Sequence, residues 1–418
     1  MSSFKDQFEI PSKYKTWSMA LMGVGVVAVL VGYFMYGSSS HTEEQQARFW
    51  GTMLQNSVYF LLICNAAMFF ICATTLGMGA FQMAFRRVTE AISVAVIPLG
   101  VIALIVLLSL IFGHQTRVYT WLVPGHDKVL NGKSVFLNAN FFVIWTILTI
   151  GLWAVLGYKM RAISRELDEN PLPDVESGKK YIFKGTVWAA LFLVWFALTV
   201  ASTIPWLWLM SIDAHWYSTM YSWYTFASTF VAGLSLIAIF VIYLKNLGYL
   251  PLVNEEHLHD IGKFMFAFSI FWTYLWFSQY MLIWYSNQPE ETIYFVDRIG
   301  NHEHSNGFKG LFFLNLIINF LCPILILMSR GSKRNYTTMA FMAVLIIFGH
   351  WLDFYQMVFP ALTKDASGQT HANINLFDLG VAAGFVGLIM FATARALAKA
   401  PLTAKNHPFF KESIIHHT

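Results

Sequence analysis

The succession of long apolar runs constrains the fold of this chain more than any other feature of its sequence. A window of about 19 residues finds ten such runs among the 418 residues. Each run is long enough to cross a hydrocarbon core of about 30 Å as a helix. They cover approximately residues 17–36, 57–84, 88–113, 135–158, 185–210, 218–244, 261–285, 310–330, 336–359 and 375–398. We therefore expect an all-α polytopic membrane protein with ten transmembrane helices.

The low content of charged residues excludes an ordinary soluble protein. Charged residues make up 12% of the chain, against about 25% in soluble domains. The spans leave little room for a separate soluble domain, so we expect a single integral membrane domain over residues 1–418. Its expected parts are an N-terminal tail (1–16), spans one to four (17–160), a loop (161–184), spans five to ten (185–398) and a C-terminal tail (399–418).

The distribution of Lys and Arg predicts the orientation in the membrane. An even number of spans places both termini on one side, and that side holds 20 of the 27 Lys and Arg residues. Cytoplasmic loops carry the excess of these residues in membrane proteins. We therefore expect a multi-pass protein with both termini in the cytoplasm.

The stretch GHWLDFYQ, residues 349–356, places two ionisable side chains inside the ninth span. His350 and Asp353 lie three residues apart and share one face of a helix. Counted back from Pro360 at about 1.5 Å per residue, Asp353 lies roughly 10 Å and His350 roughly 15 Å along the span. Ionisable groups at such depth are costly and mark functional sites. We expect the two residues to form a proton-accepting pair, since His titrates near neutral pH; the alternative is a structural hydrogen bond between helices.

A second cluster lies between the fifth and sixth spans, in PWLWLMSIDAHWYSTMYSWY (205–224). Most of its aromatic residues are typical of the membrane interface. Asp213 and His215 fall in the tight turn between the two spans, so they are expected at the membrane surface. A proton acceptor at this position could meet periplasmic water, and we include both residues in the predicted proton path.

Further polar residues fall in the outer halves of the late spans. Each alone is typical of a hydrogen bond between helices. Together with His350 and Asp353, they predict one polar pocket that opens toward the outer leaflet. These residues are Gln279, Tyr280, Asn315, Asn319 and Asp378.

The sequence offers few ligands for a metal or a haem. A haem held between helices needs a His from each of two spans, and His350 is the only His well inside one. Cys64, Cys72 and Cys322 form no CxxC pair, so iron–sulfur clusters and structural zinc lack a ligand set. The HEH at 302–304 fits a solvated turn better than a metal site. We expect no covalently bound or metal-ligated cofactor, and nothing indicates a nucleic-acid partner.

Ten spans, cytoplasmic termini and an outward-facing polar pocket resemble the NrfD-like family of polysulfide-reductase-type membrane subunits. Within it, the block from Pro205 to Phe226 is similar to that of the ActF-type subunits of bacterial alternative complex III. Trp208 matches the pattern typical of these subunits, and His-Trp-Tyr-Ser-Thr at 215–219 matches it fully. The resemblance implies two four-helix bundles, spans two to five and six to nine, flanked by spans one and ten.

The resemblance also implies a function in the respiratory chain of a bacterial inner membrane. Complexes of this type oxidise a quinol, for which menaquinol is the expected form, and reduce a c-type cytochrome or an attached terminal oxidase. The implied partners are c-type haem subunits, a large iron–sulfur subunit and a sister NrfD-like subunit. The implied ligands are a quinone and lipids. Aromatic residues beside the His–Asp pair, among them Tyr355, would suit a flat apolar headgroup.

Two other functions remain open from the sequence. An ion-coupled secondary transporter would also explain a carboxylate inside the membrane, although no clear pair of Gly- or Pro-broken helices stands at matching places in the two halves. Pro205 and Pro323 are the nearest candidates. A structural scaffold, whose polar groups only pack helices together, is the third possibility.

Overall fold

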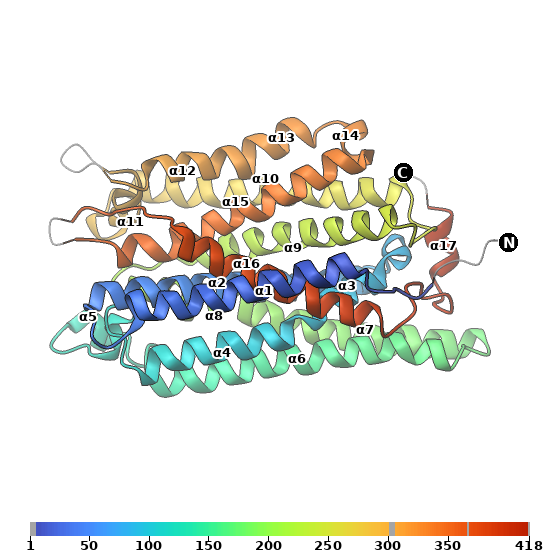
Figure 1. The fold of residues 1–418 in the computed structure, drawn as a ribbon, viewed down its shortest axis with the longest axis horizontal. Coiled ribbons are helices and arrows are strands. Elements are labelled where there is room, and N and C mark those ends of the chain that lie inside the picture. Colours follow the sequence, from blue (N-terminus) through green and yellow to red (C-terminus); the bar gives the residue numbers. More distant parts are fainter. Residues whose placement is uncertain (1–5, 301–305, 366–367, 417–418) are drawn as a thin grey trace.

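The computed structural model describes residues 6–300, 306–365 and 368–416. All regular structure in these ranges is helical, apart from one isolated bridge between Lys364 and Thr370. Most of the long helices run roughly along the long axis of the molecule (Figure 1). In the described part of the chain, nine helices are long and apolar enough to cross a membrane. This finding supports the expected all-α, multi-pass membrane protein.

The nine candidate spans are built from one or more helical elements each. They are α1 with the π-helix η1 (Ser12–Gly32, Tyr33–Gly37), α2 (Glu43–Leu76), α3 with α4 (Arg86–Val94, Val96–Phe112), α6 (Ala139–Glu169), α7 with η4, α8 and η5 (Val175–Leu198, Thr199–Thr203, Ile204–Trp208, Met210–Ile212), α9 (Met220–Asn246), α12 with η6 and α13 (Lys309–Leu316, Ile317–Leu321, Cys322–Ile326), α15 (Tyr336–Leu362) and α16 (Leu376–Leu397).

The remaining elements comprise one further long helix and several short ones. The long helix is α10 (Glu255–Ser286), which has 32 residues but falls outside the nine by composition. The short elements are η2 (Phe81–Ala84), η3 (Thr120–Leu122), α5 (Lys128–Gly132), α11 (Pro289–Ile299), α14 (Arg330–Arg334) and α17 (Phe410–Ile414).

Two helices form the centre of the molecule. α2 is buried almost continuously from Gly51 to Cys72, and α9 from Tyr224 to Leu244. α2 packs against α4, α7 and α9, while α9 packs against α10 and α15 as well. A helix with apolar residues on all sides is expected at such a position. The other spans therefore surround a core made by α2 and α9.

The first and last spans pack along each other. A Cβ atom added to Gly25 of α1 would lie 2.3 Å from the Cα atom of Gly384 in α16. Two glycines thus allow the helix backbones to touch, as small residues do between helices in membranes. Gly384 ends the GVAAG stretch of the sequence, and Gly380 at its start faces Ala28 of α1.

The second span differs from its expected range of 57–84. α2 begins at Glu43, after Thr42 and Gln45 form a capping box at its N-terminus. This cap is polar and is followed by a polar first turn, so a search for apolar residues does not detect it. The helix ends at Leu76. Arg48, which stands between the expected ranges of the first two spans, therefore lies inside α2.

The segment expected as a loop at 161–184 is mostly helical. α6 continues to Glu169 and α7 begins at Val175, so only residues 170–174, with two prolines, connect them. The polar ends of both helices project beyond their neighbours (Figure 1). The expectation of a long loop was wrong because hydropathy detects the apolar part of a helix and not its polar extension. Similarly, the outer segments at 114–134 and 286–308 include the short helices α5 and α11.

Candidate functional site

The carboxylate of Asp353 lies where α9, α10, α12 and α15 meet. It is 1% exposed and accepts four hydrogen bonds. Oδ1 accepts from the hydroxyl of Tyr224 and from Nδ2 of Asn315 at 2.9 Å. Oδ2 accepts from the hydroxyl of Ser228 and from the indole N–H of Trp272, both at 3.0 Å. An ionised carboxylate accepts hydrogen bonds at about four positions and donates none, so the four donors match the ionised form.

His350 reaches Asp353 through a serine. Nδ1 of His350 lies 3.8 Å from Oδ2 of Asp353, which is too long for a hydrogen bond. The hydroxyl oxygen of Ser228 lies 2.9 Å from that nitrogen and 3.0 Å from the carboxylate. The expected pair therefore exists as a linked group of three residues rather than as a direct contact.

The hydrogen bonds of Ser228 also decide the form of the imidazole. A hydroxyl has one proton to donate, and the acceptor-only carboxylate of Asp353 takes it. The serine oxygen then accepts from Nδ1–H of His350, which leaves Nε2 as a proton acceptor in the neutral ring. Nε2 is buried and has no partner among the described residues. His350 thus offers a vacant acceptor beside a buried carboxylate.

Gly349 allows α15 to approach the π-helix η6. A Cβ atom at this position would lie 2.2 Å from Oδ1 of Asn319 and 2.4 Å from Cγ2 of Ile318. On the α12–η6 side of this contact, Nδ2 of Asn319 donates to Oδ1 of Asn315 at 2.5 Å. Asn315 then donates to Asp353. The glycine before His350 therefore lets a chain of two amides reach the carboxylate.

A small cavity borders Asp353. Its volume is about 20 Å³, and its lining includes Asn315, Gln279 and Arg298. About 10–15 Å³ is sufficient for one water molecule. Nε2 of Gln279 has no partner among the described residues, so it is available to a small polar guest. The structure thus brings Gln279 and Asn315 together with Asp353, as the sequence predicted.

Arg298 of α11 supplies a buried positive charge on the far side of this cavity. Its guanidinium donates to the main-chain oxygens of Tyr294 at 2.6 Å and Gln356 at 2.7 Å. It also lies over the ring of Tyr294, 3.4 Å from the centroid. The ring of Trp216 stacks on the ring of Tyr294, with the two ring centroids 4.1 Å apart. The turn between η5 and α9 is therefore fastened to the helix that carries Arg298.

Asp213 lies in that turn and is partly buried. Burial raises the pKa of its carboxyl most, the charge of Arg298 lowers it, and the charge of Asp297 raises it. Asp297 itself forms an ion pair with Lys364 at 2.8 Å. Asp213 is thus electrostatically coupled to charged groups that stand next to the Asp353 cavity.

His215, in the same turn, contacts Asp127 and not the Asp353 cavity. It is exposed, and its Nε2 lies 2.6 Å from Oδ2 of Asp127. This hydrogen bond lowers the pKa of the Asp127 carboxyl. Lys133 donates to the main-chain oxygen of Ala214 at 2.6 Å. The structure therefore places His215 in a surface contact with the 114–134 segment and not at the Asp353 cavity.

Asp378 and Tyr355 belong to a separate cluster around Arg48, which we call the Arg48 cluster. Asp378 is fully buried, forms an ion pair with Arg48 and accepts from the hydroxyl of Thr52 at 2.6 Å. Arg48 also donates to the hydroxyl of Tyr355 at 3.3 Å. The polar groups here satisfy one another. The single pocket expected from the sequence is thus divided in two, because α2 brings in an arginine that was assigned to a loop.

One further predicted residue, Tyr280, lies outside the Asp353 cavity. Tyr280 stacks nearly parallel to Trp276, with ring centroids 6.3 Å apart, and does not line the cavity. The HEH at 302–304 lies outside the described residues.

Four residues at the site were not predicted from the sequence: Tyr224, Ser228, Trp272 and Arg298. Tyr224 and Ser228 stand four residues apart on α9, a spacing that places them on one helix face. Neutral Tyr, Ser and Trp are common in spans, so this spacing alone did not distinguish them. Arg298 falls between the expected seventh and eighth spans, where a single arginine does not indicate a site.

Comparison with known proteins adds no identification, since neither a family model nor a curated protein matches this sequence. Within the described ranges, no three His, Cys, Asp or Glu side chains come together as a metal-ligand set. Cys64 and Cys72 are buried free thiols, and Cys322 is a half-buried one.

Proposed function

We propose that this chain is a membrane subunit of a quinol-oxidising respiratory complex of the alternative complex III type. In this proposal His350, Ser228 and Asp353 accept and relay the protons that quinol oxidation releases. The observation that carries it is the buried Nε2 of His350, which has no partner among the described residues, beside a buried carboxylate with neutral donors. The similarity of residues 205–226 to subunits of such complexes supports the choice of reaction.

The chemistry requires both a proton acceptor and an electron acceptor. Oxidation of one quinol yields the quinone, two protons and two electrons. The electrons would leave through a large iron–sulfur subunit and c-type haem subunits toward cytochrome c or a terminal oxidase. A proton arriving at Nε2 of His350 would form an imidazolium whose Nδ1 lies 3.8 Å from Asp353. The nearby negative charge stabilises that imidazolium, as positioned carboxylates do in acid–base catalysis.

The size of the cavity limits the role of this site. A volume of about 20 Å³ holds a single water and excludes a quinone ring. The proposed role is therefore proton transfer, with the quinol, expected to be menaquinol, bound outside the cavity or at the sister NrfD-like subunit. Arg298 and Asp213 would form the route from the cavity toward the periplasm, where Asp213 lies at the end of its span.

We further propose ten spans, in which α10 joins the other nine as the seventh along the chain. α10 packs along α9 and is 32 residues long. Spans two to five would form one four-helix bundle and spans six to nine the other, flanked by α1 and α16. An even number of crossings places both chain ends at the same end of the molecule, and α17 lies at the same end as the start of α1 (Figure 1). With the excess of Lys and Arg at that end, both termini are proposed to be cytoplasmic in a bacterial inner membrane.

An ion-coupled transporter is the second candidate, and one observation favours it. Two spans are interrupted by a π-helix, η4 and η6, and each interruption is followed at once by a short helix with a proline in its first turn, Pro205 and Pro323. Proline lacks the N–H that would continue the helix, and interrupted helices form the ion sites of many transporters. η6 also carries Asn319, which is part of the Asp353 network.

Purification in a mild detergent distinguishes the two candidates. If the proposal holds, an affinity-tagged chain should bring c-type haem absorbance and iron–sulfur protein with it. The purified assembly should also transfer electrons from a quinol to cytochrome c. A chain that purifies without haem proteins, and that drives solute uptake when reconstituted with an ion gradient, would instead support the transporter.

A further inference from the structure

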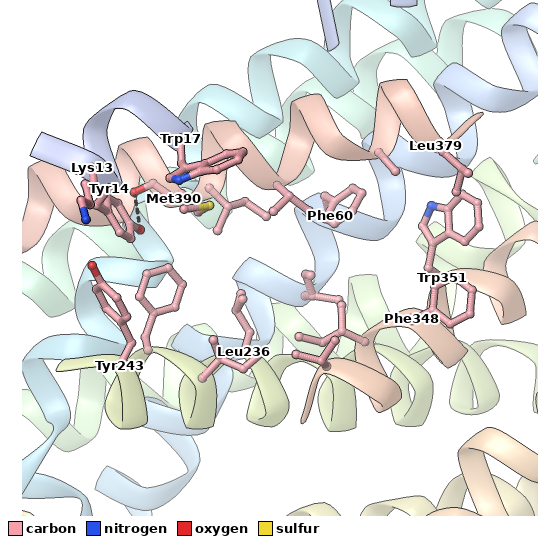
Figure 2. A pocket seen from close by; sticks show the side chains of 18 residues that line it. Lys13, Tyr14, Trp17, Phe60, Leu236, Tyr243, Phe348, Trp351, Leu379 and Met390 are labelled. Atoms are coloured by element: carbon pink, nitrogen blue, oxygen red, sulfur yellow. Dashed lines mark hydrogen bonds between the residues drawn. The ribbon is translucent and has the colours of Figure 1, made fainter. Parts of the chain in front are cut away.

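A large groove runs along the membrane-facing side of the molecule, away from the Asp353 cavity. Its volume is about 630 Å³. One wall is the pair formed by α1 and α16, and the opposite wall is formed by α9 and α15, with Phe60 of α2 between them (Figure 2). The lining is almost entirely apolar. Such a groove in a membrane span is filled by an apolar molecule, since water gains no polar partner there.

The length of the groove is close to the depth of one membrane leaflet. On α16 its lining extends from Leu379 to Met390, about 16 Å of helix at about 1.5 Å per residue. Half of a hydrocarbon core of about 30 Å is about 15 Å. The groove therefore suits an extended chain that enters from one membrane surface.

One end of the groove carries polar and aromatic groups. Lys13, Tyr14 and Tyr243 lie together at this end (Figure 2), and Trp17 beside them is 65% exposed. Tyr and Trp at such a position mark the membrane interface. The hydroxyl of Tyr14 donates to the main-chain oxygen of Met390 at 3.1 Å. Lys13 is exposed, and none of the ion pairs found within the described residues involves it.

At the opposite end, the polar groups of the described lining residue Trp351 are already paired. The indole N–H of Trp351 donates to Oδ1 of Asn56 at 2.9 Å, and the main-chain oxygen of Trp351 accepts from Gln55 at 3.0 Å. A quinone ring at this end would find no donor for its carbonyl oxygens. Among the described residues that line the groove, Lys13 is the only charged one, and its cation at the interface attracts a negatively charged headgroup.

We propose that this groove is a binding site for an anionic phospholipid. One acyl chain lies along the groove from the interface toward Trp351, and the headgroup phosphate pairs with Lys13. The site depends neither on the proton chemistry at Asp353 nor on the identity of the complex.

The test is native mass spectrometry of the protein purified in detergent, together with any partners that purify with it. Binding is measured for phosphatidylglycerol and for phosphatidylcholine of equal chain length. The wild type should bind phosphatidylglycerol more tightly by about fivefold, which corresponds to the attraction of one lysine near an anionic surface, about 1 kcal/mol. Lys13→Ala should remove this preference. Lys15→Ala, two residues away and outside the lining, should retain it.

A second pair of variants tests the groove itself. Ala382→Trp fills the groove and should lower the binding of both lipids, whereas Ala20→Trp, on the exposed side of α1, should leave binding unchanged. Equal binding of the two lipids by the wild type, or undiminished binding by Ala382→Trp, would overturn the proposal. The proposal would also be overturned if an isoprenoid quinone displaced the lipid and its binding required the open groove but not Lys13.

Discussion

Asp353 and Asp378 are both buried carboxylates, but their partners give them different roles. Asp378 faces the guanidinium of Arg48, so its charge is already balanced. Asp353 is held by neutral donors, and the nearest group that can become positive is His350. Uptake of a proton by His350 would neutralise this cluster. Of the two sites, the one at Asp353 is therefore suited to proton exchange, and the Arg48 cluster to holding helices together.

The Arg48 cluster should contribute to stability through its ion pair. Asp378→Asn leaves the arginine without a counter-charge, and breaking a buried pair in this way costs about 3–5 kcal/mol. A double variant, Arg48→Met with Asp378→Asn, should recover much of that loss because no unpaired charge remains. Unfolding of the purified protein in mixed micelles measures both. Equal stability of the parent and of Asp378→Asn would contradict the pairing.

At the scale of elements, the contact between α15 and η6 depends on a missing side chain. Gly349→Ala should force the helices apart, since its Cβ would overlap the Asn319 side chain. We expect a loss of about 1–3 kcal/mol, as for overpacking in a tight core, and a weaker Asn315–Asp353 hydrogen bond. Gly151→Ala in α6 is the matched control, because a Cβ there meets nothing within 4 Å. The same unfolding measurement compares them, and an equally small effect at both positions would refute the close approach.

The C-terminal segment packs against η2 and against the nearby ends of α7 and α10. Ser413 of α17 donates to the main-chain oxygen of Phe81, and His257 of α10 lies 3.0 Å from the main-chain oxygen of Ser413. His407 is buried against the ring of Tyr181. Burial lowers the pKa of His407 to about 3, with smaller contributions from Arg86 and Arg87.

Docking of this segment should weaken in acid. A released His407 regains a pKa near 6.5 and binds a proton that the docked form excludes. The contribution to docking is therefore complete above about pH 6.5 and declines toward pH 3, by about 1.4 kcal/mol per pH unit. Hydrogen exchange of residues 402–416 at pH 7.5 and pH 5.0, corrected for intrinsic rates, should show lower protection at pH 5.0. His407→Phe should reduce the difference; an undiminished difference in this variant would assign the effect to another group.

Much of the fold could be predicted from the sequence because apolar runs report the buried part of each span. The ends of the helices could not, since caps such as Thr42 and the polar tips of α6 and α7 look like loops. The site around Asp353 could likewise be predicted only in part. His350 and Asp353 stand out because charge is costly in a membrane. Ser228 and Trp272 do not, and only the packing of α9 against α15 and the contact of Trp272 with His350 show that they bind the carboxylate.

At the scale of the whole molecule, the orientation follows from charge. The segments near Lys128 and Arg298 should be periplasmic and the segment near Lys179 cytoplasmic, because Lys and Arg are concentrated on the side of both termini. This can be tested with single cysteines at positions 128 and 179 in a chain that lacks its native cysteines. An impermeant reagent then labels the exposed cysteines in intact spheroplasts. Labelling at 179 without labelling at 128 would reverse the orientation.

The central claim is that Asp353 serves proton transfer, and one substitution separates this role from a structural one. Asp353→Asn retains the size of the side chain and one carbonyl oxygen, and the hydroxyls of Tyr224 and Ser228 can rotate to accept from the new amide. We therefore expect the variant to assemble, at a cost of about 1–3 kcal/mol for imperfect hydrogen bonds. Asp378→Asn provides the same chemical change at the other buried carboxylate.

The decisive measurement is quinol-driven reduction of cytochrome c, with proton release recorded in parallel, per c-type haem in the purified complex. Asp353→Asn should lower turnover or proton release by at least about tenfold, since a positioned proton acceptor typically contributes about 10²–10⁴-fold. Asp378→Asn should retain both rates in the fraction that assembles. Full turnover and full proton release in an assembled Asp353→Asn complex would show that the carboxylate only holds helices together, and the chain would then be a structural scaffold.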